Sequence, residues 1–181
     1  VDDCLNFESG GEAASPKIAE RFYMKTIHSE TDIHAPAARV WDLLADFGNV
    51  AEWAPYMRQS QLLDGPSAGI GMRRGMRHAW GFRFEEEVTQ WHDRKGFAFD
   101  VLKAPFPMKD VKEVWVLGPE DGHTVVETQV RYGTHLGFIG RFVDWLLVRF
   151  VVRREMRAGL RGLKDHAERL SGREAAPAEP D

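Results

Sequence analysis

The spacing of apolar residues in the first third of the chain predicts one strand followed by two short helices. Residues 23–33 fit a strand. Pro36 then stands in a first-turn position, where its missing N–H costs little, ahead of a helical apolar stripe formed by Val40, Leu43, Leu44 and Phe47. Gly48 and Asn49 end this helix, and a second short helix is expected from about residue 50 to residue 55.

From residue 56 the pattern changes to short runs separated by Gly, Pro and Asp turn signals, which is typical of consecutive antiparallel strands. The expected strands are 56–64, 69–79, 82–91, 96–103, 109–118 and 123–132, and residues 138–170 then form one long helical pattern. The strand–helix alternation of a parallel sheet is missing. We therefore expect an α+β fold in which a curved antiparallel sheet of six or seven strands wraps the long helix.

Period-two alternation assigns several polar side chains to the inner face of this sheet. Arg74 and His78 share a face with Met76, and Glu86 shares one with Phe84. The inward positions of 96–103 include Phe99, and those of 123–132 include Thr124 and Thr128. In 109–118 the pattern leaves two choices open, Glu113 with Trp115 or Val114 with Val116.

The two faces predicted for His78 and Glu86 depend on the turn near Gly81. A two-residue hairpin loop would pair Ala79 with Phe82 and place His78 and Glu86 on opposite faces of the sheet. A loop one residue longer or shorter, or a bulge, would place them on the same face. A buried carboxylate or imidazole is costly unless it is paired, so such residues are either functional or satisfied by internal ion pairs.

Composition and charge limit the classes of function that this chain can have. The termini, 1–22 and 171–181, are acidic and expected to be disordered; they carry −3 and −2 of the net charge of −4, so the body of the chain, 23–170, is +1. This body lacks the basic stripe of a nucleic-acid-binding protein. Cys4 is the only cysteine, and no signal-peptide layout or membrane-spanning stretch is recognisable, so a cytoplasmic location is expected. No metal-ligand or nucleotide motif occurs, so no cofactor is expected.

Two segments of the sequence suggest contacts with a ligand, a membrane or a second copy of the chain. The segment 102–108 contains Pro105, Phe106 and Pro107, which suits a stiff apolar lid over a cavity, although it equally fits a rigid hairpin connection. The helix 138–170 carries eight basic and four acidic residues beside its apolar positions. It is expected to pack on the sheet, and peripheral membrane contact or a homodimer through its outer face are alternatives.

The order of elements and several strings resemble the START-like (helix-grip) superfamily and its polyketide cyclase/dehydrase-type members. The resemblance covers 23–170 and rests on IHAPAARVWDLLADFGNVAEWAP (33–55), on Gly69 and Gly71, on Glu87 ahead of the turn at Asp93, and on a closing helix that begins at GFIGRF (137–142). It implies a cavity for a hydrophobic small molecule, gated by the loop that corresponds to 103–108. The string VAEWAP (50–55) departs from the pattern of the quinone-binding branch.

Two functions follow from these features. The first is cyclisation or dehydration of a polyketide-like substrate, with His78 and Glu86 as the candidate catalytic residues and Arg74 as a ligand contact. The second is a non-catalytic carrier or sensor for a lipid, quinone or other apolar molecule. The other expected ligand-binding residues are Met76, Phe84, Phe99, Phe106, Trp115, Thr128, Phe142 and Leu146.

Overall fold

One seven-stranded antiparallel sheet forms the centre of the protein. The structure, a computed structural model, describes residues 24–135 and 147–175. The strand order in the sheet is β1-β7-β6-β5-β4-β3-β2, so all strands but β1 follow their order in the sequence. The strands are β1 (Lys25–Ile33), β2 (Met57–Leu62), β3 (Arg73–His78), β4 (Arg83–His92), β5 (Gly96–Lys103), β6 (Met108–Glu120) and β7 (His123–Thr134).

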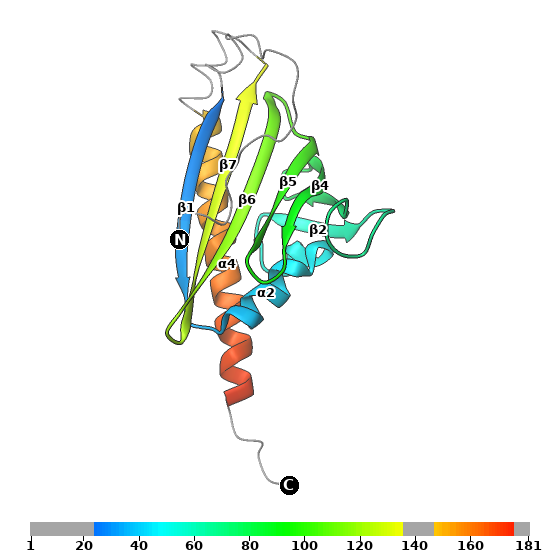
Figure 1. The fold of residues 1–181 in the computed structure, drawn as a ribbon. Coiled ribbons are helices and arrows are strands. Elements are labelled where there is room, and N and C mark those ends of the chain that lie inside the picture. Colours follow the sequence, from blue (N-terminus) through cyan, green and yellow to red (C-terminus); the bar gives the residue numbers. More distant parts are fainter. Residues whose placement is uncertain (1–23, 136–146, 176–181) are drawn as a thin grey trace, which may run out of the picture.

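In the part of the chain that the structure describes, three helical segments cover one side of this sheet. They are α2 (Ala37–Ala45), the 3-10 helix η1 (Phe47–Glu52) and the long helix α4 (Arg149–Ala175). Figure 1 shows the curved sheet with α4 running along β1 and β7, while α2 lies at the end of the sheet where β1 finishes. This arrangement confirms the predicted α+β helix-grip architecture.

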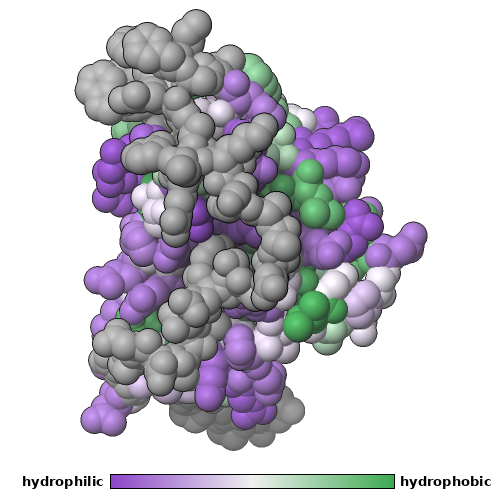
Figure 2. Space-filling view, turned by 45° about the horizontal axis from the view of Figure 1, so that its top comes forward, coloured by the Kyte–Doolittle hydropathy of each residue, from purple (hydrophilic) through white to green (hydrophobic). Residues whose placement is uncertain are grey.

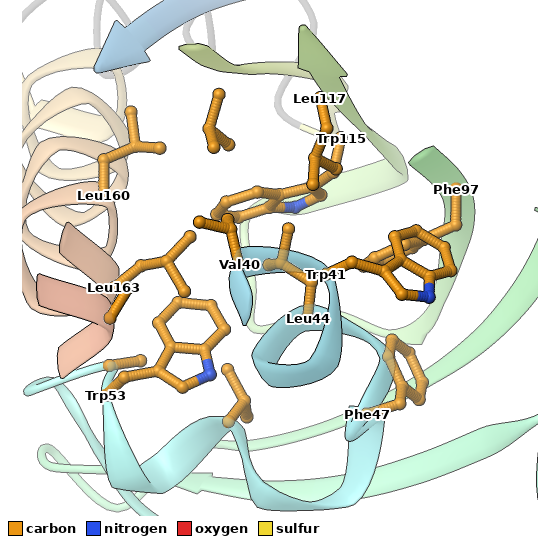
Figure 3. Packing of buried hydrophobic residues seen from close by; sticks show 14 of the residues in the cluster. Val40, Trp41, Leu44, Phe47, Trp53, Phe97, Trp115, Leu117, Leu160 and Leu163 are labelled. Carbon is orange, nitrogen blue, oxygen red and sulfur yellow. The ribbon is translucent and has the colours of Figure 1, made fainter. Parts of the chain in front are cut away.

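Among the described residues, the apolar core consists of two clusters. The larger one joins α2, η1 and the C-terminal half of α4 to the sheet; Figure 3 shows Leu160 and Leu163 of α4 pointing toward Trp115 of β6, with Val40 of α2 among them. The smaller one joins β1, β6 and β7 to the N-terminal half of α4 through Val152 and Met156, and to Val148 just before that helix. Apolar burial of this kind supplies the main driving force for the fold.

The burial of alternate residues confirms the inner faces predicted for β3, β4 and β7. Arg74, His78, Glu86, Thr124 and Thr128 are all at most 6% exposed. In β6, where the sequence left two choices, the inward positions are the odd ones: Trp115 and Leu117 are buried, and Glu113 faces Phe99 of β5 and Val130 of β7.

The loop of the β3–β4 hairpin is one residue longer than the two-residue loop considered in the sequence analysis. Arg74 faces Glu86 and Met76 faces Phe84, and the His78 amide donates to the Phe82 carbonyl at 2.8 Å. Residues 79–81 therefore form a three-residue loop, with Gly81 at a φ of +91° that favours glycine. This register places His78 and Glu86 on the same face of the sheet.

Several predicted boundaries were wrong. Pro36 is the N-cap of α2 rather than a first-turn residue, and the second short helix lies at 47–52 instead of 50–55. β3 starts only at Arg73, because Gly69 and Gly71 adopt φ values of +82° and +85°, which a strand does not accept. The tail expected to be disordered from residue 171 is helical as far as Ala175, since Arg, Glu and Ala continue the helical pattern.

Two glycines of α4 allow the chain around η1 to approach the helix closely. A Cβ on Gly162 would lie 1.8 Å from the Trp53 carbonyl oxygen, and a Cβ on Gly159 would lie 2.8 Å from the Tyr56 hydroxyl. The close contact is with the segment that joins η1 to β2, and this contact positions Trp53 and Tyr56.

Within the described residues, no helix is long and apolar enough to cross a membrane. The prediction of disorder for 1–22 and the first part of the predicted helix, 138–146, lie outside the described residues.

Candidate functional site

A cavity of about 310 Å³ lies between the sheet and α4, where the two core clusters meet. Its wall is mostly apolar and includes residues from the α2–η1 region, from strands β3 to β7 and from α4. The curvature of the sheet holds the strands away from α4 in this region, and side chains from all these elements enclose the space. An apolar hollow with a few polar groups is the usual form of a small-molecule site.

The structure places most of the expected site residues in this wall. His78, Glu86, Arg74, Met76, Phe84, Phe106 and Trp115 all line the cavity. Phe99 is instead 1% exposed and packs under Arg74, with its ring centroid 5.2 Å from the guanidinium carbon. Thr128 is also buried and hydrogen-bonds to a residue of the wall. Phe142 and Leu146 lie outside the described residues.

Arg74 and Glu86 form a buried ion pair. Arg74 donates from Nε and from a terminal nitrogen to Glu86 Oε2 at 2.7 and 2.6 Å, and donates to the Phe47 carbonyl at 3.1 Å. Its guanidinium carbon also lies 3.8 Å from the centroid of the Phe47 ring. Burial raises the pKa of Glu86 and Arg74 opposes this shift. The guanidinium is thus engaged on its edge and on its face, which holds it in one orientation.

His78 contacts a carboxylate of the helix. Its Nε2 lies 2.9 Å from Glu155 Oε1, and its Nδ1 accepts a hydrogen bond from the Trp80 amide at 3.1 Å. Because a backbone amide can only donate, Nδ1 is the acceptor in this contact, and Nε2 is left to donate to Glu155. Burial raises the pKa of Glu155, and His78 opposes this. His78 and Glu86 therefore share the wall, but His78 contacts Glu155 and Glu86 pairs with Arg74.

Glu113 is the titratable group that is best placed to meet a ligand. It projects from the centre of β6 into the cavity, and it accepts a hydrogen bond from Thr128 Oγ1 at 3.2 Å. Burial and, next, the negative charge of Glu86 raise the pKa of Glu113 to about 7, while Arg74 and hydrogen bonds from Trp115 and Thr128 oppose the shift. This carboxyl group therefore exchanges a proton near neutral pH.

The connection between β5 and β6 borders the mouth of the cavity. Its residues 104–107 and Met108 all contribute to the wall. Phe106 is 71% exposed and its ring stacks on His135 at 6.4 Å between centroids. Trp80, Phe82 and Leu147, which also line the cavity, are exposed as well. Figure 2 shows apolar residues reaching the surface in patches among hydrophilic ones.

Sequence reasoning missed three polar residues of the wall, Asp46, Tyr56 and Glu155. The spacing of Glu155 contained the signal, because it is three residues after the buried Val152 and therefore lies beside the inward stripe of α4. Tyr56 directly follows Pro55 at the start of a strand and gave no comparable pattern; burial and the charge of Glu113 raise the pKa of its phenol. Among the described residues, no group of three or more potential ligands is placed to hold a metal ion.

Solved structures with the same fold come from several sources. An uncharacterised protein from Bacillus thuringiensis is 20% identical, with a TM-score of 0.65 over 80% of this chain and 98% of that one. The protein TTHA0849 from Thermus thermophilus is 20% identical, with a TM-score of 0.68 over 81% and 99%. Ara h 8.0201 is 12% identical, with a TM-score of 0.64 over 80% and 97%. A comparison with curated proteins finds no match.

The sequence itself matches one family model, described as "Polyketide cyclase / dehydrase and lipid transport", over residues 24–168. That range includes every strand, the helices before β2 and most of α4. The chain therefore belongs to the polyketide cyclase/dehydrase and lipid transport family.

Proposed function

We propose that the protein binds an apolar small molecule in the cavity between the sheet and α4. The observation that carries the proposal is the cavity of about 310 Å³, whose size and mostly apolar wall are those of a ligand site. Removing about 100 Å² of apolar ligand surface from water contributes roughly 2.5 kcal/mol, so a ligand that fills the cavity gains several times RT before its polar group is considered.

Filling the cavity tests this proposal. Val101 lines the cavity from β5, and Val101→Trp should occupy much of the space and abolish binding of the neutral apolar dye Nile red. Val125→Trp is the matched control, since Val125 lies on the outward face of β7. Wild-type protein that fails to bind the dye, or equal binding by both variants, would contradict the proposal. Native mass spectrometry of protein purified from its own host should detect the natural ligand.

Cyclisation or dehydration of a polyketide-like substrate in the same cavity is a second candidate function, and Glu113 is the observation that favours it. A group whose pKa is about 7 is well suited to take a proton from carbon beside a carbonyl and to return it to a departing hydroxyl, which leaves as water. Glu113→Gln should then lose turnover of a poly-β-ketone and keep its binding.

The catalytic role predicted for His78 and Glu86 stays a prediction. Each would have to work from within its present contact, His78 with Glu155 and Glu86 with Arg74. Glu86→Gln and His78→Ala, assayed for both binding and turnover, test it: turnover lost with binding retained supports catalysis, and equal loss of both supports a carrier.

A further inference from the structure

The charges in the cavity wall are strongly unbalanced. Among its described residues are four carboxylates, Asp46, Glu86, Glu113 and Glu155, and a single permanent cation, Arg74. A charged group held in an apolar wall favours a ligand of opposite charge and disfavours one of the same charge, because water screens the interaction only weakly there.

Arg74 is not available to balance a ligand anion. Three of its five N–H donors contact Glu86 and the Phe47 carbonyl, and its guanidinium lies over the Phe47 ring. The positive charge of Arg74 is already paired with Glu86 at 2.6 and 2.7 Å. An anionic ligand group would therefore approach an ion pair rather than a free cation.

His78 is not open to a ligand anion either. Its Nδ1 accepts from the Trp80 amide and its Nε2 lies 2.9 Å from Glu155 Oε1, so both ring nitrogens are engaged. Burial raises the pKa of Glu155, and the attraction of His78 and Arg154 opposes this shift. A ligand anion at this end of the cavity would meet the Glu155 carboxyl group beside an imidazole that is already engaged.

Glu113 offers the best-placed negative charge to a ligand. The groups that hydrogen-bond to it, the Thr128 hydroxyl and the Trp115 side chain, are neutral donors from β7 and β6. Trp115 and Trp53 meet edge to face with ring centroids 5.8 Å apart, so aromatic rings also form part of the wall near this residue. A cation beside Glu113 would gain an ionic hydrogen bond and the attraction of these rings.

We propose that the natural ligand is an apolar molecule bearing a protonated amine, and that Glu113 binds this amine while the apolar part extends toward the mouth formed by Phe82 and Phe106. The inference rests on the proposed binding function and specifies its ligand class. It excludes free fatty acids and other anionic amphiphiles as the preferred ligands.

The proposal also fixes a dependence on pH. The charged and titratable groups that act on Glu113 are Glu86 on β4, Arg74 on β3 and Tyr56 before β2, and the same cavity wall contains Asp46 before η1, His78 on β3 and Glu155 on α4. Glu113 becomes ionised as the pH rises through about 7. Amine affinity should therefore increase between pH 5.5 and pH 8, and the affinity of an anion should fall over the same range.

Three ligands with one chain and different polar groups test the inference: dodecylamine, dodecanol and laurate, each competing with Nile red below its micellar concentration. At pH 8 wild-type protein should bind dodecylamine at least about tenfold more tightly than laurate, as expected for one ionic hydrogen bond. Glu113→Gln should lower dodecylamine affinity about tenfold and change dodecanol affinity much less. Glu127→Gln, the same change on the outward face of β7, should leave all three affinities as in wild type.

The outcomes separate the two proposals. If Nile red and dodecanol do not bind, the binding function fails and the ligand class fails with it. If dodecanol binds but laurate binds as tightly as dodecylamine, or if Glu113→Gln keeps the amine preference, the binding function stands and the ligand class is wrong. The pH series on wild-type protein provides a readout that does not depend on the folding of any variant: an amine preference equal at pH 5.5 and pH 8 would count against Glu113 as the contact.

Discussion

Replacing Gly162 by Ala tests the close contact between α4 and the backbone of Trp53, a residue of the cavity wall. The added Cβ would lie 1.8 Å from the Trp53 carbonyl oxygen, 3.0 Å from its carbonyl carbon and 3.2 Å from Pro55 Cδ. The atoms in the way belong to backbone and to a proline ring, so they cannot turn aside as a flexible side chain would. Either α4 or the segment after η1 must move.

The magnitude follows from two opposing effects. Overpacking of a close contact costs about 1–3 kcal/mol and sometimes more, whereas Gly to Ala within a helix gains about 1 kcal/mol. Gly172→Ala is the matched control in the same helix, because nothing lies within 4 Å of its added Cβ. The control should be unchanged or up to about 1 kcal/mol more stable, and Gly162→Ala should be roughly 2–3 kcal/mol less stable than the control.

Urea denaturation measures both free energies of unfolding, and for a chain of this size the difference corresponds to roughly 5–10 °C in Tm. Gly162→Ala should also weaken Nile red binding, since Trp53 lines the cavity. If Gly162→Ala proves as stable as Gly172→Ala, the close approach of the Trp53 carbonyl to α4 is refuted, together with the account of how η1 is positioned.

Three further predictions concern the cavity. Arg74→Met should destabilise the protein by about 3–5 kcal/mol in urea denaturation, because Glu86 would be buried without its partner. Arg74→Met combined with Glu86→Leu should recover most of this loss, and equal stability of the single and double variants would count against a buried pair. Phe106→Ala should increase the association and dissociation rates of Nile red in stopped-flow measurements. It should change Tm by about 1 °C or less, since the side chain is 71% exposed, and a large fall in Tm would mean that Phe106 belongs to the core. The pKa of Glu113 is higher in the folded protein than the ordinary 4.5, so the folded state holds a proton that the unfolded state has lost, and the free energy of unfolding should fall as the pH rises from about 5 to about 7. Glu113→Gln should flatten this dependence and be about 1–3 kcal/mol more stable than wild type at pH 8. A variant with the pH profile of wild type would contradict the assignment.

Much of the cavity wall could be predicted from alternation alone. A strand has a side-chain period of two, so Met76, Arg74 and His78 had to share one face, and Phe84 had to share one with Glu86. The sequence also marked the connection around Phe106 as an apolar segment between strands, and the structure places it in the cavity wall. Its role as a lid stays a prediction. The roles of these residues in binding remain predictions that the experiments above address.

The pairing of the polar groups could not be predicted. Whether β3 and β4 brought His78 and Glu86 to one face depended on a single residue in the loop at 79–81, and local sequence is compatible with either register. The face on which Glu113 lies depended on the pairing of β6 with β5 and β7, because the odd and the even positions of β6 are each apolar enough to face the core. The partner of His78 is 77 residues away on α4, at a distance in the sequence where no periodicity applies.

The sequence by itself determined the order of the elements, the fold class and the inner face of most strands, since these depend on periods of two and 3.6 residues and on turn chemistry within short windows. The tertiary structure decided which carboxylate meets Arg74, which meets His78, and that Glu113 is left to face the cavity with neutral donors only. The physical reason is that ion pairing and desolvation depend on distances of a few ångströms between segments far apart in the chain. Those distances exist only after the sheet has curled around α4 and the glycines of α4 have admitted the segment that carries Trp53 and Tyr56.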